Sequence, residues 1–379
     1  MILLYNEEVG RRNNFDLIRF LLAISVMFTH AFGIHQNGRS EPLKLLSNNQ
    51  LTVGIFAVNF FFIISGFLVL QSWRHSKGVI DFLVKRILRI YPAFIVVCIL
   101  SAFVFCPLGN GNSTNPFLHW KSYVSQIEYY KLFYSIFFLS SPEIPATFAS
   151  SPFTQEINTS LWTIWYEFVC YLVLMAMGVF KVFNFKLVPL VLFVFAIVFY
   201  ILDFNSEYFE IMNRRVSIIS EYAIERIHNL GRLIMFFLGG TCFYYYRAYI
   251  PKSRWLLLLS IVVLVLNLQL IRQIEIAQVI FGSYLLFYFA FTTKINASKF
   301  AKYGDFSYGI YLYGWPVQQL VIIYFGDKLS LAGTLFCSLL IVIPLAMLSW
   351  HLIEKQFLKF KHFSTIAFFN LSLKSSGQY

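Results

Sequence analysis

Long apolar runs, separated by short polar segments, recur along almost the whole chain. A helix needs roughly 17–25 mostly apolar residues to cross a hydrocarbon core of ~30 Å. Ten runs approach that length, at 15–34, 52–70, 87–106, 161–180, 187–202, 230–246, 255–271, 276–292, 306–325 and 329–353. The pattern therefore predicts an all-α, polytopic integral membrane protein with about ten transmembrane helices.

The composition indicates that lipid rather than water surrounds these helices. Of the 379 residues, 58% are hydrophobic and only 13% are charged, about half the charged fraction usual in a soluble domain. A soluble protein so apolar lacks the polar side chains to cover its surface. The formal net charge of +12 would favour nucleic acid in a soluble chain, but no basic tract alternates with aromatic residues on a polar face. We therefore predict membrane lipids, and no nucleic acid, as partners.

The basic residues predict how the chain is oriented. Cytoplasmic loops of membrane proteins carry an excess of Lys and Arg, and an even number of spans puts both termini on one side. Most of the 30 Lys and Arg residues fall in segments on the same side of the membrane as the N-terminus. Two longer segments, 107–160 and 203–229, lie on the other side of the membrane. We expect both termini to be cytoplasmic, with one membrane-embedded domain over 1–379 and a short cytoplasmic tail at 357–379.

The cysteines give no sign of a disulfide framework or a metal site. They are Cys98, Cys106, Cys170, Cys242 and Cys337, and most lie inside apolar runs. None is paired with another at the spacing of a metal site or a redox motif. We interpret them as small buried hydrophobic residues, and we expect no metal.

The first apolar run holds polar residues that a membrane span carries only at a cost. A charged side chain at the centre of a span costs roughly 2.5–3.5 kcal/mol, so each one needs a reason. Arg19 and His30 are 11 residues apart, about three helical turns, and project from nearly one face. Asp16 precedes Arg19 by three residues and can pair with it. Either Arg19 snorkels with Asp16 while His30 caps the outer end, or this face is a polar path that holds an anion and moves a proton.

Glu167 is a second ionisable residue inside a predicted span, about two turns from the outer end of the fourth run. His30 lies about one turn from the same side on its own helix, so we expect the two side chains at comparable depth. Such a pair would form a general base and the group that orients it. Alternatively, Glu167 pairs with another buried polar group and holds the helices together.

Basic residues gather at the predicted cytoplasmic entrance to the third run. Arg86 and Arg89 share one helical face, with Lys85 beside them. Such residues usually anchor a helix at the interface, but an arginine pair also suits the phosphates of a nucleotide-bearing donor. In the second run, Ser65 and Gly66 interrupt the apolar residues. They permit either close contact between helices or room for a ligand.

Six segments, taken in order, resemble the acyltransferase-3 family of bacterial membrane proteins. They are Phe15-Asp16 with Arg19 and His30, Phe60-Phe61-Phe62-Ile63-Ile64-Ser65-Gly66-Phe67, Lys85-Arg86-Ile87-Leu88-Arg89-Ile90-Tyr91-Pro92, Ser160-Leu161-Trp162 with Glu167, Gly304-Asp305-Phe306-Ser307-Tyr308-Gly309-Ile310-Tyr311-Leu312 and Ser349-Trp350-His351-Leu352-Ile353-Glu354. Any one of these motifs is weak, but six in the same order are specific.

The resemblance implies a membrane O-acyltransferase that moves an acyl group, usually acetyl from acetyl-CoA, to a hydroxyl of a glycan. It also implies that Arg19 and His30 are essential and that the basic motif serves the donor. Two features depart from the family pattern. Its fifth motif often continues to a His before a Pro, whereas this chain reads Tyr313-Gly314-Trp315-Pro316. The esterase-like domain of two-part members is not expected in this stand-alone membrane domain.

These observations lead to one functional hypothesis. Acetyl-CoA would be the acyl donor, and a cell-surface or lipid-linked glycan (O-antigen, capsule or exopolysaccharide) would be the acceptor. In the basic motif, Lys85, Arg86 and Arg89 would hold the CoA phosphates, with Arg19 aiding the pantetheine or thioester end. His30 would act as general base or briefly carry the acyl group, with Glu167 orienting it or binding the acceptor.

A transporter or flippase of lipid-linked sugars is the alternative hypothesis. Such proteins also combine many spans with buried charges. They are expected to show repeated halves and helices broken at the midplane. This sequence shows neither feature, so we favour the acyltransferase.

Overall fold

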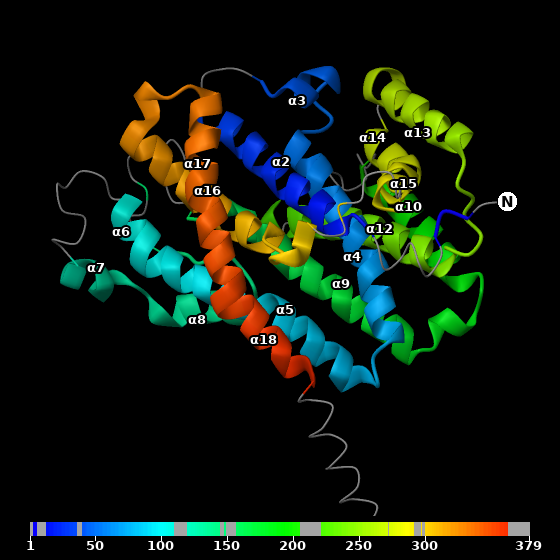
Figure 1. Cartoon of the computed structure of the whole chain (residues 1–379), viewed down its shortest axis with the longest axis horizontal. Coiled ribbons are helices and arrows are strands. Elements are labelled where there is room, and N and C mark those ends of the chain that lie inside the picture. Colours follow the sequence, from blue (N-terminus) through cyan, green and yellow to red (C-terminus); the bar gives the residue numbers. More distant parts are fainter. Residues whose placement is uncertain are drawn as a thin grey trace, which may run out of the picture.

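The computed structural model describes residues 3–5, 13–35, 40–109, 120–144, 148, 157–204, 221–271, 273–291, 297 and 300–362. Within these ranges the chain is helical, and one isolated bridge joins Leu3 to Pro251. Figure 1 shows the helices crossing one another obliquely in one bundle. The all-α prediction is therefore confirmed. Much of the predicted outer segments and residues 363–379 of the predicted tail lie outside the described residues.

Each of the ten apolar runs overlaps a helix. The longer helices are α2 (Phe15–His35), α4 (Val53–Arg74), α5 (Val79–Leu100), α9 (Trp162–Val179), α10 (Val188–Phe204), α12 (Glu221–Tyr245), α13 (Arg254–Leu266), α16 (Ser307–Phe325) and α17 (Leu331–Ser349). The shorter ones are α3 (Pro42–Leu46), α6 (Cys106–Gly109), α7 (Trp120–Gln126), α8 (Tyr129–Phe137), α14 (Ile274–Ala277), α15 (Ser283–Ala290) and α18 (Lys355–Lys359). Single π-helical turns continue several of them, among them η5 (Gln278–Gly282) and η8 (Trp350–Glu354).

Six helical stretches of the described chain are long and apolar enough to cross a membrane. They are Phe15–His35, Val53–Arg74, Val79–Gly109, Thr159–Val179, Arg254–Ile271 and Leu331–Lys359. Two apolar helices, Val188–Leu202 and Ile274–Ala290, are shorter, whereas α12 and α16 are as long but less apolar. Length and composition thus identify a membrane protein with six candidate spans, and the count of ten stays a prediction.

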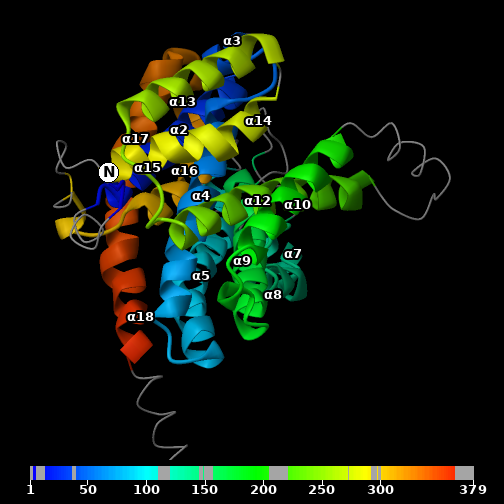
Figure 2. The same ribbon diagram turned by 90° about the vertical axis from the view of Figure 1, so that its right-hand side faces the viewer.

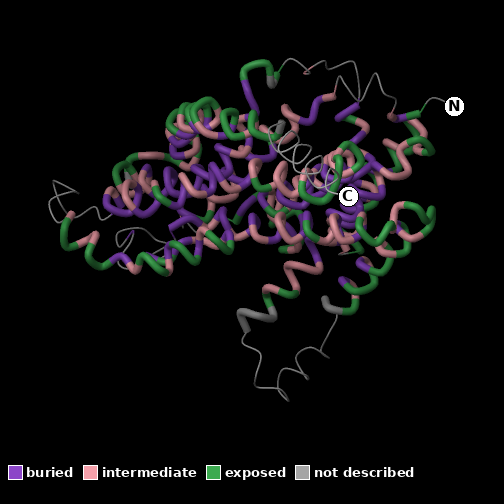
Figure 3. The backbone as a smooth tube through the Cα atoms, turned by 90° about the horizontal axis from the view of Figure 1, so that it is seen from below, coloured by how far each residue is buried: buried purple, intermediate pink, exposed green. Residues whose placement is uncertain are grey.

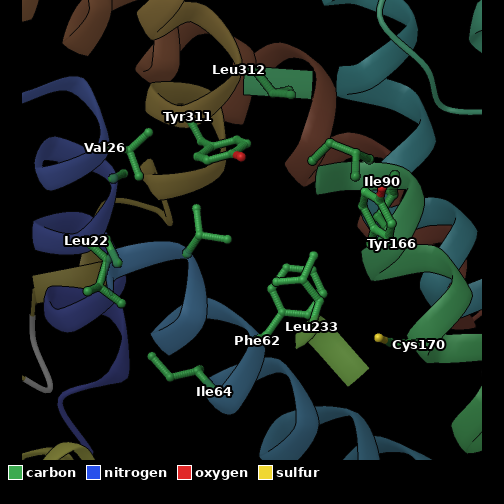
Figure 4. Close-up of a cluster of buried hydrophobic side chains, with 14 of the residues drawn as sticks. Leu22, Val26, Phe62, Ile64, Ile90, Tyr166, Cys170, Leu233, Tyr311 and Leu312 are labelled. Carbon is green, nitrogen blue, oxygen red and sulfur yellow. The ribbon is translucent and has the colours of Figure 1, made fainter. Parts of the chain in front are cut away.

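Large apolar side chains lie both inside the bundle and on its outer surface. Leu22, Phe62, Tyr166 and Tyr311, from four different helices, are buried around one interior (Figure 4). Figure 3 shows the exposed segments mainly on the outer turns of the tube. Many of these outer positions are large and apolar, as at Phe195. An apolar outer surface suits helices whose solvent is lipid.

The helices α4 and α12 cross so closely that each carries a glycine at the contact. A Cβ atom on Gly66 would lie 1.9 Å from the carbonyl oxygen of Phe237. One on Gly240 would lie 1.9 Å from the carbonyl oxygen of Ile63. Any larger residue would push the two backbones apart. The sequence left two roles open for Gly66, close contact between helices or room for a ligand, and the structure shows the close contact.

A buried polar cluster ties α4 and α12 to the neighbouring helices. The guanidinium of Arg232 donates to Asn59 at 3.0 Å and pairs with Glu275 at 3.2 Å. Asn59 donates in turn to Gln278 at 3.0 Å, and Tyr200 of α10 donates to Glu275. Figure 2 shows α10 beside α12, extending away from the rest of the bundle. Since each charge has a partner, the cluster stabilises these contacts in apolar surroundings.

Candidate active site

A cavity of about 840 Å³ opens within the bundle. Its walls come from α4, α5, α9 and α16, with Arg19 from α2 and the end of the C-terminal helix at one side. The end of α4, the start of α5 and α18 lie at the same end of the molecule (Figure 1). Six of the nine predicted site residues line this cavity: Arg19, Ser65, Lys85, Arg86, Arg89 and Glu167. The other three, Asp16, His30 and Gly66, do not.

One face of α4 follows the cavity for nearly the whole length of the helix. The lining residues recur three or four apart, as one helical face requires. Those on this face are Val58, Phe61, Ser65, Leu68, Ser72 and His75, and the neighbouring Phe62, Ile64 and Val69 also line the cavity. Val58 and His75 are 17 residues apart in the sequence, which is about 25 Å along the helix axis. The cavity therefore runs from the C-terminal end of α4 far into the bundle.

The entrance to the cavity, around the end of α4, is basic. His75, Lys77, Lys85 and Lys361 line it, together with the single carboxylate of Asp81. The ammonium of Lys85 donates to Asp81 at 2.7 Å. Lysine ammonium groups at a cavity mouth attract anions and bind phosphate as point charges. The entrance is thus suited to a ligand with several negative charges.

Arg86 lies behind the entrance residues and retains an N–H group that can donate a hydrogen bond to a ligand. Its Nη2 donates to Ser72 at 3.0 Å, and its guanidinium lies over the rings of Phe82 and Tyr171. Its Nε is buried without a hydrogen-bond partner among the described residues. Because a buried unpaired donor is costly, Arg86 is well placed to bind an anion that enters the cavity.

Arg89, in contrast, is held by protein carboxylates. Its Nη2 donates to Asp305 at 2.5 Å, and its Nη1 lies 3.7 Å from Glu354. Asp305 also pairs with Arg19, at 3.1 Å, and accepts from Ser307 at 2.6 Å. Arg89 and Arg19 are therefore joined through one buried carboxylate, whereas no carboxylate is found within ion-pair distance of Arg86 among the described residues.

The charge on Asp305 is stabilised by this arrangement. Asp305 precedes α16 and is almost fully buried. Burial raises the pKa of its carboxyl, but Arg19 and Arg89 beside it lower the pKa more, so it lies well below the ordinary value. Arg19 is also paired with Asp16, as the sequence predicted, and its Nε has no hydrogen-bond partner in the described part of the chain.

Glu167 and His30 lie at different depths in the bundle. The hydroxyl of Thr29, next to His30, accepts from the backbone N–H of Gly54 at 2.7 Å. Glu167 instead contacts Ser65 at 3.5 Å and accepts a hydrogen bond from Tyr171. Gly54 and Ser65 are 11 residues apart on α4, or about 16 Å along its axis. The expectation that Glu167 and His30 lie at comparable depth is therefore wrong.

His30 lies beyond the far end of the cavity. Its ring packs edge-on against Trp315 of α16, with centroids 4.8 Å apart. Its Nδ1 is buried and makes no hydrogen bond with the residues that the structure describes. Tyr311, one turn before Trp315 on α16, lines the cavity. An imidazole with a buried, unused nitrogen, one turn past the cavity, is suited to exchange a proton with a bound group.

The segment before α9 is held inside the bundle by a hydrogen bond to a carbonyl of α16 that a proline leaves free. Pro316 lies inside α16 and has no N–H to donate to the carbonyl of Leu312, four residues earlier. The side chain of Asn158 donates to that carbonyl at 2.8 Å instead. Asn158 is fully buried. The polar residue before the fourth run therefore completes the hydrogen bonding of α16.

Sequence reasoning missed four side chains that complete this site. Asp305 and Glu354 hold Arg89, Tyr171 donates to Glu167, and Tyr311 closes the far end. Both carboxylates and Tyr311 lie in motifs that carry the family resemblance, which was the available signal. Among the described residues, no three His, Cys, Asp or Glu side chains are grouped to hold a metal ion.

Comparison with known proteins adds an independent observation. The family described as acyltransferase domain matches residues 12–351. The chain is 29% identical over 350 residues to an O-acetyl transferase of Shigella phage Sf6, covering 92% of this chain and 96% of that protein. It is 33% identical over 173 residues, 44% of each chain, to nodulation protein 10 of Rhizobium leguminosarum bv. viciae. No solved structure matches.

Proposed function

This chain belongs to the acyltransferase-3 family and is a membrane O-acyltransferase, and we propose that it transfers acetyl from acetyl-CoA to a hydroxyl of a cell-surface or lipid-linked glycan. The observation that carries this proposal is the order of polarity along the cavity. Its entrance is basic, its middle holds arginine and hydrogen-bonding groups, and its far end is apolar. An acyl-CoA presents the matching order of phosphates, amide-containing arm, thioester and acyl group.

The phosphates of the donor would bind at the basic entrance. Lys77, Lys85 and Lys361 supply positive charge there, and Arg86 supplies an unused donor behind them. Charge-assisted hydrogen bonds of this kind are about twice as strong as neutral ones. Arg89, already paired with two carboxylates, supports the site instead of contacting a phosphate.

The chemistry would take place at the opposite end. Arg19, midway along the cavity, would contact the pantetheine arm, so that the thioester lies beyond it toward the far end. The acceptor oxygen attacks the thioester carbonyl, its proton passes to His30, and the C–S bond breaks. The thiolate of CoA then takes up the proton held by His30, which returns the imidazole to its neutral form. This order needs the acceptor to arrive from the side of the membrane nearer His30.

The proposal includes ten spans in a bacterial inner membrane, with both termini in the cytoplasm. The gathering of Lys77, Lys85 and Lys361 at one end of the bundle supports this orientation, because cytoplasmic ends are enriched in basic residues. Acetyl-CoA would then enter from the cytoplasm. O-antigen, capsule and exopolysaccharide are the proposed acceptor classes.

Donor binding can be tested with the purified protein in lipid nanodiscs. Radiolabelled acetyl-CoA should bind, and S-acetyl-pantetheine, which lacks the nucleotide and its phosphates, should compete at least about 100-fold less well, as expected for the loss of two charge-assisted hydrogen bonds. Lys85→Gln should weaken acetyl-CoA binding. Lys359→Gln, an exposed lysine of α18 outside the cavity lining, should not.

Two results would count against the proposal. Equal competition by S-acetyl-pantetheine would contradict a site that holds phosphates. Absence of acetyl-CoA binding, together with movement of a lipid-linked sugar across vesicle membranes, would favour the transporter instead.

A further inference from the structure

The far end of the cavity is the part whose chemistry differs most from the entrance. Val58, Phe61 and Phe62 line it from α4, Thr163 from α9 and Tyr311 from α16. Four of the five are almost fully buried, and Phe61 is half-buried. Figure 4 shows Tyr311 projecting from α16 into the interior around which these helices pack. This end is therefore an apolar chamber, bounded by aromatic rings.

The two hydroxyl groups of the chamber form a hydrogen bond with each other. Thr163 and Tyr311 share a hydrogen bond of 2.6 Å, which joins α9 to α16 across the end of the cavity. The ring of Phe61 packs edge-on against Tyr311, with centroids 6.1 Å apart. On the side formed by α4, α9 and α16, the wall is thus closed by one hydrogen bond and one aromatic contact.

None of the described residues that line the chamber carries an ionised side chain. Glu167, the nearest charged residue along α9, is four residues from Thr163, or about 6 Å along the axis. A ligand carboxylate that lies in the chamber, beyond Glu167, would lose its hydration without pairing with a cation. Burying an unpaired charge in this way is strongly unfavourable. An uncharged group is favoured over an anionic one.

We propose that this chamber is the acyl pocket, and that Phe61 and Tyr311 restrict the donor to short, uncharged acyl groups. The inference rests on the proposed function, because it takes the phosphates of the donor to lie at the basic entrance. The acyl group is at the other end of an acyl-CoA. It therefore lies in the chamber, where the closed wall limits its length and the absence of a cation excludes succinyl or malonyl groups.

Competition binding tests this pocket without knowledge of the acceptor. Wild-type protein in nanodiscs is loaded with radiolabelled acetyl-CoA and displaced with unlabelled acetyl-, butyryl-, hexanoyl- and succinyl-CoA. Acetyl-CoA should compete best among them and succinyl-CoA worst. In Phe61→Ala the ratio of hexanoyl- to acetyl-CoA affinity should rise at least about 10-fold, the scale on which apolar pockets discriminate by size.

Phe56→Ala is the matched control, because Phe56 lies on the same helix and packs against Phe60 outside the cavity lining. Its affinity ratio should stay that of the wild type. If Phe61→Ala does not fold, Phe61→Leu provides a smaller enlargement, with a smaller shift in the same direction. An unchanged ratio in a folded Phe61 variant, or succinyl-CoA binding as tightly as acetyl-CoA, would overturn the acyl pocket. Absence of any acyl-CoA binding would instead overturn the proposed function.

Discussion

Replacement of His30 by alanine is expected to abolish glycan acylation while membrane insertion and acetyl-CoA binding persist. A sugar hydroxyl is a poor nucleophile at neutral pH, and a positioned general base contributes roughly 10²–10⁴-fold to its reaction. The imidazole has a buried, unused Nδ1 and lies outside the cavity lining. The loss should therefore fall on the chemical step and not on donor affinity. Radiolabel transfer and acetyl-CoA binding, measured on the same preparation, separate the two.

His35→Ala is the matched control on the same helix. His35 shares a hydrogen bond of 2.7 Å with Thr334 of α17, so its replacement should affect transfer only mildly. Normal acetyl transfer by His30→Ala would show that the imidazole has a structural role at the outer end of α2.

Arg89→Ala is expected mainly to lower stability, whereas Arg86→Ala is expected mainly to weaken acetyl-CoA binding. Removal of Arg89 leaves Asp305 and Glu354 without a shared cation, and breaking a buried ion pair costs about 3–5 kcal/mol of stability. Removal of Arg86 leaves no such carboxylate pair behind. It should weaken acetyl-CoA binding by about 10- to 100-fold, the effect of one charge-assisted hydrogen bond, with a smaller change in stability. Denaturant unfolding in detergent and acetyl-CoA affinity measure the two effects.

A double variant checks the electrostatic origin of the Arg89 effect. Glu354→Gln removes one of the two charges left behind, so it should recover part of the stability lost in Arg89→Ala. If Arg89→Ala were as stable as the wild type and bound acetyl-CoA as weakly as Arg86→Ala, Arg89 would be a phosphate ligand after all.

The helices of this protein could be predicted from the sequence, because apolar length alone defines a helix in lipid. The pair of Asp16 and Arg19 was also predictable, since residues three apart meet on one helical face. The link between Arg19 and Arg89 was not. It passes through Asp305, 216 residues from Arg89 in the sequence, and no local spacing encodes such a contact.

The depth of Glu167 could not be counted from the sequence for a different reason. Counting residues inward from the outer end of a span assumes that every span begins at the membrane surface. The fourth run begins inside the bundle, where Asn158 is fully buried and bonded to α16. Its first turn is therefore already deep, and Glu167 comes to lie beside Ser65 instead of His30.

Transfer of label across the membrane tests the whole proposed reaction, from donor binding to acylation of the glycan. Inside-out vesicles that contain the protein and its host's surface glycans receive acetyl-CoA, radiolabelled in its acetyl group, on their exposed cytoplasmic face. With wild-type protein we expect base-labile label in the glycan fraction, and we expect its loss in His30→Ala and, at limiting donor, in Arg86→Ala. Two results would contradict transfer through this cavity: wild-type protein that never labels the glycan, or both variants labelling it as well as the wild type.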